Sequence, residues 1–542
     1  MSNKKNSFLM HGSLLALAGL LTRFIGLMYR IPLTRIVGSE GMTYYNVAYE
    51  IYNLALLIST YSIPVAVSKL VAAKDAQNEF KNSNRIFKYA MLFVSGIGLA
   101  ASAVLFIFAD SFSAFMEYPS AAIPLRVLAP TIFIFSFMGV IRGFFQGKRT
   151  MIPTAISQIV EQIFNAIASV LAAYLLIKAY SDSSQAPAYG AAGGTTGTLV
   201  GAIFGLIFLV ILYLFKRKGL KENEKNDSNA DIDSVGTIIK AVLLTMLPII
   251  LSQTIYQISG IVDIKIFGNI MQSKGFDEKE RAILWEAYSN KYKWLYNVPV
   301  AVASAFGVSI VPTLASSYSK KDFDGIREKI ASSIKFNMLI AFPSAAGLGF
   351  LAKPILKLIF EDSNDIYADK LMMLGCVAVV VFGLSTLTNG VLQGISRMRL
   401  PVIHSAISLA VHVVLLFVLL YFFDMSVYGL VIGNVTYGLL VCILNAHSIK
   451  KILNYKQEIL KTFILPAIAS LIMGAAALGI YRLAAMIQLG NAVSTVIAIF
   501  AAIIIYMLLV IVLGIFDEQE LSNMPKGRTL VRIFKKLHLL RK

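Results

Sequence analysis

The stretch NAVSTVIAIFAAIIIYMLLVIVLGI, residues 491–515, carries no charged side chain. It is long enough to cross a bilayer, since a membrane-spanning helix needs roughly 20 apolar residues. Thirteen earlier stretches have similar length and character. The fourteen predicted spans are residues 12–34, 44–70, 86–109, 121–143, 152–177, 191–215, 237–268, 292–317, 331–352, 368–392, 401–423, 427–449, 461–482 and 491–515.

The composition of the whole chain agrees with a membrane protein. Of its 542 residues, 57% are hydrophobic and 15% are charged, whereas about a quarter are charged in an ordinary soluble domain. The mean hydropathy is +0.72. This balance excludes a soluble enzyme, a disordered protein and a disulfide scaffold. We therefore predict an all-α integral membrane protein.

The distribution of charged residues among the loops predicts the membrane topology. The net charge of +19 would suggest a nucleic-acid partner in a soluble protein, but cytoplasmic loops of membrane proteins collect Lys and Arg. Lys216–Lys218, Lys320–Lys321 and Lys450–Lys451 fit this rule, and the loops 110–119 and 424–426 carry acid without base. We predict a multi-pass protein of the cell membrane with both termini in the cytoplasm and no nucleic-acid partner.

One polar stretch divides the predicted spans. Residues 216–236, KRKGLKENEKNDSNADIDSVG, have almost no large apolar side chain, which is typical of a flexible linker. The predicted parts are an N-terminal lobe with helices 1–6, a cytoplasmic linker, a C-terminal lobe with helices 7–12, helices 13–14 and a basic amphipathic cytoplasmic tail. Their residues are 1–218, 219–236, 237–450, 451–516 and 517–542.

Two short similarities indicate an internal repeat. IPLTRIVG at Ile31–Gly38 resembles IVDIKIFG at Ile261–Gly268, and GFFQG at Gly143–Gly147 resembles GVLQG at Gly390–Gly394. Each pair lies six predicted helices apart, so both copies keep the same orientation. This spacing predicts two six-helix lobes related by a parallel repeat, an arrangement found in transporters. In addition, glycines in steps of four from Gly193 to Gly205 predict a ridge for close helix packing.

Several charged residues lie inside predicted spans, where a charge costs about 2.5–3.5 kcal/mol on insertion scales. We expect Arg23 and Arg30 to face a water-filled cavity, with Glu50 and Glu161 as candidate ion-pair partners. For Lys293, together with Arg35, Lys265 and Lys291, snorkelling to the outer interface is an equal alternative. The candidate substrate-binding residues are Arg23, Arg30, Glu50, Glu161 and Lys293.

These groups suit anion binding better than catalysis. Arginine presents a planar fork that matches phosphate oxygens. No carboxylate pair has a spacing suited to acid–base chemistry, and the two cysteines and five histidines form no known metal-ligand pattern. There is also no nucleotide-binding GxxxxGK[ST] loop. We predict no catalytic residue, no cofactor and no enzymatic activity.

The helix 1 sequence LTRFIGLMYRIPLTRIVG, Leu21–Gly38, resembles the first helix of the MOP exporter superfamily. Within it the chain is most similar to the polysaccharide-type branch of Gram-positive bacteria, which includes lipid II flippases and a sporulation protein. NGVLQG at Asn389–Gly394 and the fourteen-helix count support the same resemblance.

The resemblance implies two lobes around a cationic cavity, with helices 13 and 14 forming a groove for a polyprenyl tail. It implies that Arg23 and Arg30 contact the substrate, with Lys293, before Pro299, as the basic residue of helix 8. Ile31 and Leu54–Leu57 depart from the pattern, because relatives carry an acid and an arginine pair there. Asp263 matches the aspartate of a sodium site in some relatives, although His412 stands where an asparagine would suit sodium better.

The resemblance therefore implies a flippase that moves a polyprenyl-pyrophosphate-linked cell-wall precursor, lipid II foremost, from the inner to the outer leaflet. Alternatives are a flippase for another lipid-linked oligosaccharide, a MATE-type drug/cation antiporter and a membrane-embedded glycosyltransferase or acyltransferase. Na⁺ and the membrane potential are both candidate driving forces. No pattern sets the oligomeric state, and a monomer is consistent with the chain.

Overall fold

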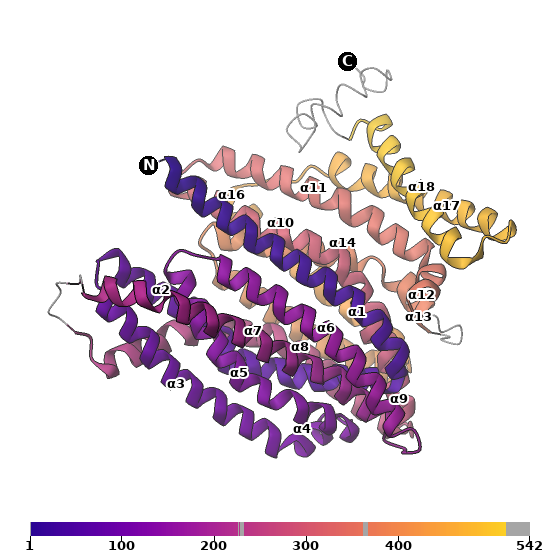
Figure 1. The fold of residues 1–542 in the computed structure, drawn as a ribbon. Helices are drawn as coiled ribbons and strands as arrows, with labels where there is room; N and C mark the ends of the chain where they lie inside the picture. The colour runs from indigo at the N-terminus through magenta and orange to yellow at the C-terminus, as the bar shows by residue number, and fades with distance from the viewer. Residues whose placement is uncertain (1, 226, 228–231, 361–366, 516–542) are drawn as a thin grey trace. The chain divides into compact units, whose positions relative to one another are not determined.

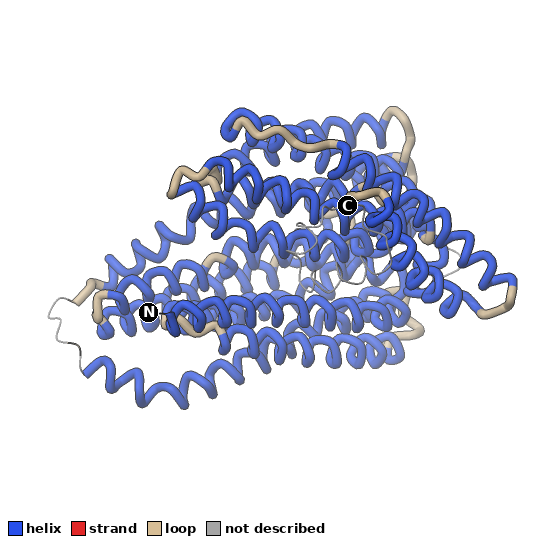
Figure 2. Tube along the Cα trace, turned by 90° about the horizontal axis from the view of Figure 1, so that it is seen from above, coloured by secondary structure: helices blue, strands red, loops and turns tan. Residues whose placement is uncertain are grey.

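The computed structural model describes residues 2–225, 227, 232–360 and 367–515, and all of their regular secondary structure is helical (Figures 1 and 2). The chain forms two compact units, Met1–Glu286 and Ala287–Lys542. The predicted tail, 517–542, lies outside the described residues. The all-α membrane class is therefore confirmed.

The first unit contains nine α-helices, one π-helix (η1) and one 3₁₀-helix (η2) among its described residues. They are α1 Ser2–Leu56, η1 Leu57–Tyr61, α2 Ile63–Ala76, α3 Phe80–Ile107, α4 Ala109–Phe115, η2 Pro119–Ala121, α5 Ala122–Gly147, α6 Ile152–Ala179, α7 Ala186–Lys225, α8 Val235–Ser273 and α9 Glu278–Glu286.

The second unit contains nine α-helices and two π-helices, η3 and η4, among its described residues. They are η3 Ala287–Lys293, α10 Trp294–Ser319, α11 Phe323–Phe350, α12 Ala352–Phe360, α13 Ala368–Gly375, α14 Ala378–Gly394, α15 Arg399–Tyr421, α16 Ser426–Leu453, η4 Leu460–Ile464, α17 Leu465–Met486 and α18 Gly490–Val512.

In the described residues, eight helices are long and apolar enough to span a membrane, or ten if each of two bent pairs counts as one span. The bent pairs are α11 with α12, at 80°, and α13 with α14, at 50°. These ten coincide with ten predicted spans. The other four predictions fall on helical segments too: α1 before Gly38, the rest of α1 with η1 and α2, α8, and α10. The total of fourteen stays a prediction.

Gly38 separates the first two predicted spans. Its backbone has φ 72° and ψ 175°, within an otherwise helical α1. This conformation is open almost only to glycine, because in other residues the Cβ would clash with the residue's own adjoining backbone. No neighbouring atom lies within 4 Å of a Cβ built there. The backbone bend alone therefore accounts for glycine at this position.

Small residues and aliphatic side chains build the interior of the first unit. Ile63, Val67 and Val71 of α2 pack with α3, α5 and α8 in one buried cluster. A Cβ built on Gly147 of α5 would lie 2.7 Å from Val71 Cβ, so only glycine permits this approach of α5 and α2. Because α8 also packs on α1, α2 and α3, residues 237–286 belong to the first compact unit.

The predicted linker begins as helix and is attached to the end of α2 and the start of α3. Helix α7 continues to Lys225. The backbone N–H and Nζ of Lys81 both donate to Asp227, at 2.7 and 2.9 Å. Lys74 forms an ion pair with Asp233 at 2.8 Å. Asp227 is buried. The structure differs from a freely flexible linker because hydrogen bonds at Asp227 and an ion pair at Asp233 hold it.

Local features repeat along the chain. The π-helices η1 and η3 begin at Leu57 and Ala287, separated by the same 230 positions as the similar motifs Ile31–Gly38 and Ile261–Gly268. Gly394, the counterpart of Gly147, packs against α10: a Cβ built on it would lie 2.9 Å from Leu314 Cβ. Helices α2 and α10 are equivalent in the predicted repeat, so the structure supports this repeat.

Helices 13 and 14 of the prediction are α17 and α18, which lie side by side (Figure 1). Their small residues, among them Ala477 and Ala498, form a buried cluster with Leu339 of α11. A Cβ built on Gly474 would overlap the ring of Phe350. Their outward residues, including Phe500 and Ile504, are exposed, as expected for helices that face lipid tails.

Candidate functional site

Arg23 and Arg30 are seven residues apart on α1, which places them two turns apart on one face of the helix. The Arg23 side chain is exposed and the Arg30 side chain is partly buried. Helix α1 therefore presents a basic stripe.

Contacts within the first unit order the deeper arginine. Arg30 Nη2 donates to Asn46 Oδ1 at 2.6 Å, across the bend at Gly38. Its guanidinium lies 5.7 Å from the centre of the Tyr45 ring, within the range of a cation–π interaction. The Tyr45 and Tyr49 ring centroids are 4.6 Å apart. The Asn46 amide and the Tyr45 ring therefore both contact the Arg30 guanidinium.

Glu161 lies on α6, where it forms an ion pair with Arg142 of α5. Arg142 Nη2 lies 2.8 Å from Glu161 Oε2, and Arg142 Nε donates to Ser157 Oγ at 3.0 Å. The sequence suggested a helix 1 arginine as the partner, and the structure corrects that expectation. The sequence analysis does not single out Arg142. The signal for it is present in the sequence, since Arg142 is a charged residue inside the predicted span 121–143.

Glu50 approaches α8. A Cβ built on Gly260 would lie 2.9 Å from Glu50 Oε2, so glycine leaves room for this carboxylate. Asp263, one turn further along α8, is only 3% exposed. Two acidic side chains are therefore placed along one segment of α8 in the first unit.

The described residues contain no group of three or more His, Cys, Asp or Glu side chains that could hold a metal ion. His412, the other residue considered for sodium, is buried on α15 in the second unit. The cation role of Asp263 stays a prediction.

The lysines near helix 8 differ in their surroundings. Lys293 is the last residue of η3, in the second unit, and its Nζ lies 6.0 Å from the centre of the Tyr288 ring. Lys291 is only 3% exposed. Lys265 Nζ pairs with Glu117 Oε1 at 2.5 Å in the first unit. The proposed substrate contact of Lys293 stays a prediction.

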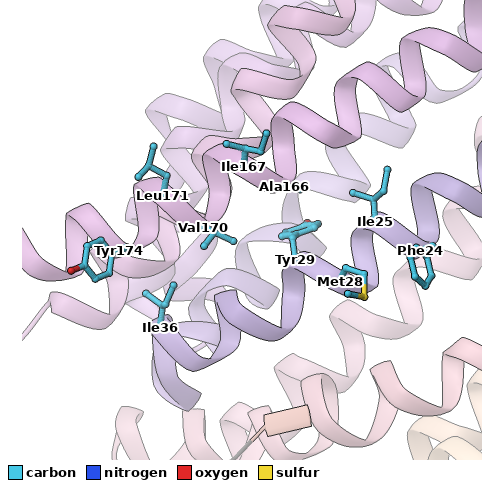
Figure 3. A pocket seen from close by; sticks show the side chains of 10 residues that line it. All are labelled: Phe24, Ile25, Met28, Tyr29, Ile36, Ala166, Ile167, Val170, Leu171 and Tyr174. Carbon is cyan, nitrogen blue, oxygen red and sulfur yellow. The ribbon is translucent and has the colours of Figure 1, made fainter. Parts of the chain in front are cut away.

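An apolar groove lies on the face of α1 opposite to Arg23 and Arg30, as the helical spacing of its lining residues shows. It has a volume of about 750 Å³ and lies between α1 and α6 (Figure 3). Phe24 and Met28 of α1 are 61% and 56% exposed and line it together with Leu171 and Tyr174 of α6. Helix α1 thus presents apolar side chains on one face and the basic stripe on the opposite face.

Numerous apolar helices, two units with repeated features and ordered basic side chains define an integral membrane transport protein. Residues 8–318 match the family described as polysaccharide biosynthesis protein, and residues 295–418 match the MatE family. The chain belongs to the polysaccharide biosynthesis protein family of the MOP superfamily. Members and structural neighbours of this family are transporters and not enzymes.

Relatives match over most of the chain. The chain is 27% identical over 536 residues to the uncharacterized membrane protein YabM of Bacillus subtilis, covering 96% of each chain. It is 26% identical over 429 residues to the lipid II flippase MurJ of Bacillus subtilis, covering 76% of this chain and 77% of MurJ. The structure of lipid II flippase MurJ in an inward closed conformation has a TM-score of 0.68 at 17% identity, covering 92% of this chain and 98% of that one.

Proposed function

We propose that this protein moves a polyprenyl-pyrophosphate-linked cell-wall precursor, lipid II foremost, from the inner to the outer leaflet by alternating access. The observation that carries the proposal is the basic stripe on α1, where Arg23 is exposed and Arg30 is ordered by Asn46 and Tyr45. The Bacillus subtilis relative named lipid II flippase supports the substrate class.

The chemistry of the stripe fits a pyrophosphate. Charge-assisted, bidentate hydrogen bonds from arginine to phosphate are strong and directional. Ordering Arg30 before the substrate arrives reduces the conformational entropy lost on binding. Arg23 and Arg30 would therefore bind the pyrophosphate, whereas Glu50, Glu161 and Lys293 would bind the glycan or position the basic groups. We place the polyprenyl tail along α17 and α18.

The test of this proposal is complementation. The gene is expressed in a Gram-positive cell depleted of its own lipid II flippase, and growth and outer-leaflet lipid II are measured. Restored growth with surface-exposed lipid II is the expected result. A cell that stops growing while the protein is present in its membrane at normal levels would contradict lipid II as the substrate, and capsule or teichoic-type precursors would then be assayed.

The first prediction concerns Arg23. We expect Arg23→Ala to abolish complementation, because the exposed guanidinium binds phosphate, and to leave the amount of membrane-inserted protein unchanged. Arg23→Lys should retain part of the activity because it keeps the charge and loses the fork. Lys320→Ala, at an exposed position on the predicted cytoplasmic side, is the control. Full growth with Arg23→Ala would refute the assignment.

The MatE match over residues 295–418 favours a second candidate, a drug/cation antiporter. A cationic substrate calls for acidic contacts, and the α1 stripe is basic. Resistance to cationic drugs in an efflux-deficient host, without complementation of the flippase-depleted cell, would favour this candidate.

A further inference from the structure

A pocket of about 430 Å³ lies in the second unit, between α11, α14, α16 and the segment that joins α16 to η4. Ile334, Leu384, Cys442 and Phe463 supply apolar side chains to its walls. Its polar side chains include His447, Lys450, Lys456 and Gln457, from the end of α16 and the joining segment. The pocket is therefore amphipathic.

The polar side of the pocket is cationic. Lys450 and Lys456 are exposed and line it, and neither forms an ion pair with any residue in the described part of the chain. No carboxylate is among the lining side chains, and Glu458 of the same segment does not line the pocket. Two uncompensated positive charges at the edge of an apolar pocket complement an anionic headgroup.

The joining segment is held in place. Arg327 Nε of α11 donates to the carbonyl of Leu453 at 2.8 Å, and Asn454 ends α16 in the left-handed conformation. Tyr455 Oη donates to Gln457 Oε1 at 2.8 Å. Burial, with the nearby Glu458, raises the pKa of Tyr455 to about 12, so its hydroxyl remains a hydrogen-bond donor at neutral pH.

A buried polar network fixes the opposite wall. Thr388 of α14 lines the pocket and accepts a hydrogen bond from Asn445 Nδ2 at 3.0 Å. Asn445 Oδ1 in turn lies 2.7 Å from His404 Nδ1 of α15. Satisfied buried networks of this kind make a structure rigid, so the pocket is formed before any ligand binds.

The position of the pocket identifies a ligand. Helix α16 is one of the membrane spans and η4 begins the next one, so the joining segment lies at a membrane boundary. The basic loops predict that this boundary is cytoplasmic, where the leaflet is anionic and each nearby Lys contributes to lipid attraction. We propose that the pocket binds an anionic phospholipid of the cytoplasmic leaflet. Its phosphate lies at Lys450 and Lys456, and the part of its acyl chains next to the headgroup lies on the apolar walls.

The test uses the purified full-length protein in neutral detergent micelles. Phosphatidylglycerol, phosphatidylcholine or soluble pyrophosphate is titrated, and the fraction of protein that stays monodisperse after heating is measured. We expect phosphatidylglycerol alone to protect the protein. The lipid concentration for half protection should rise about tenfold or more in the double variant Lys450→Gln/Lys456→Gln, since both attractive charges are removed.

Matched variants separate the pocket from general surface charge. Lys320→Gln/Lys451→Gln removes two exposed charges from the same predicted side, outside the pocket, and should respond like the wild type. Ala446→Trp fills the pocket while keeping both lysines and should weaken protection. If the double glutamine variant does not fold, Lys456→Gln alone should still show a few-fold loss.

Three results would overturn the proposal: equal protection of the wild type and the pocket variant, equal loss in the control variant, or equal protection by soluble pyrophosphate. The measurement requires no transport, so its failure is independent of the proposed flippase function.

Discussion

The ion pair between Arg142 and Glu161 places two charges inside the first unit, with side-chain exposures of 11% and 21%. Removing one partner leaves the other charge partly buried. Breaking a fully buried pair costs about 3–5 kcal/mol. Residual exposure of this pair lowers the expected cost to roughly 1–3 kcal/mol. We therefore predict that Glu161→Gln lowers the temperature at which the detergent-solubilised protein aggregates.

Two further variants check this prediction. Arg142→Gln/Glu161→Gln should lose less stability than the two single changes combined, because it leaves no unpaired charge. Asp324→Asn removes the partner of the more exposed Arg327 and should change stability little. A Glu161→Gln protein as heat-resistant as the wild type would show that the pair is not structurally important.

The charged residues of the candidate site stand out in the sequence, and their contacts do not. Charges such as Arg23, Arg30 and Glu161 stand out in apolar spans because each is costly there. The contact of Arg30 with Asn46 depends on the bend at Gly38. The pairing of Glu161 with Arg142 depends on how α5 and α6 face each other. Neither geometry is encoded in hydrophobic spacing.

At the scale of elements, the glycine ridge of α7 determines how closely α6 and α7 pack. A Cβ built on Gly197 would overlap Ser169 and the backbone of Asn165. The Ser169 hydroxyl donates to the carbonyl of Gly194 at 2.7 Å, which joins the two helices across the ridge. The sequence prediction of a structural ridge is confirmed at Gly193, Gly197 and Gly201, all of which face α6.

We predict that Gly197→Leu separates α6 from α7 and lowers the free energy of unfolding by about 1–3 kcal/mol or more, the cost of overpacking. Gly96→Leu is the matched control: Gly96 also lies inside a membrane helix, and no atom lies within 4 Å of a Cβ built on it. Thermal aggregation and membrane expression should fall only for Gly197→Leu. Equal behaviour of the two variants would contradict the ridge.

Helices and their repeat followed from the sequence because apolar length and small-residue spacing are local signals. The π-helices η1 and η3 did not follow, since they are defined by i→i+5 backbone hydrogen bonds, which uniformly apolar spans do not reveal. The bend of 50° between α13 and α14 was also missed, because the apolar pattern of the predicted span 368–392 continues across it.

At the scale of the whole molecule, the next prediction is the membrane topology. We expect a cysteine at Ser111 to react with an impermeant thiol reagent added outside intact cells and a cysteine at Gln77 to be protected. Both positions are exposed, so each cysteine is accessible to a reagent on its own side of the membrane. Buried positions in the neighbouring loops, such as Ser113 and Asp227, would label weakly from either side and are avoided. Cys376 and Cys442 are first replaced by alanine. Labelling at Gln77 from outside would contradict the fourteen-span arrangement.

The last prediction concerns the energy source, for which we propose the inside-negative membrane potential. A bound pyrophosphate carries roughly two negative charges, which the two arginines of the basic stripe offset, so the loaded protein moves outward with little net charge. The empty protein returns with both arginines uncovered. Each positive charge that moves inward gains about 2.3 kcal/mol per 100 mV, and two gain about 4–5 kcal/mol, close to the roughly 5.5 kcal/mol that shifts a 1:99 population to 99:1.

The return step therefore carries the dependence on the potential, because the empty protein carries Arg23 and Arg30 uncovered and the potential draws positive charge inward. We therefore expect outer-leaflet headgroup exposure to fall when an ionophore collapses the potential at constant sodium. Removing sodium at constant potential is the matched control and should have little effect. Headgroup exposure on the outer leaflet that persists without the potential would reject this cycle. Loss of headgroup exposure on sodium removal alone would instead favour a cation at Asp263.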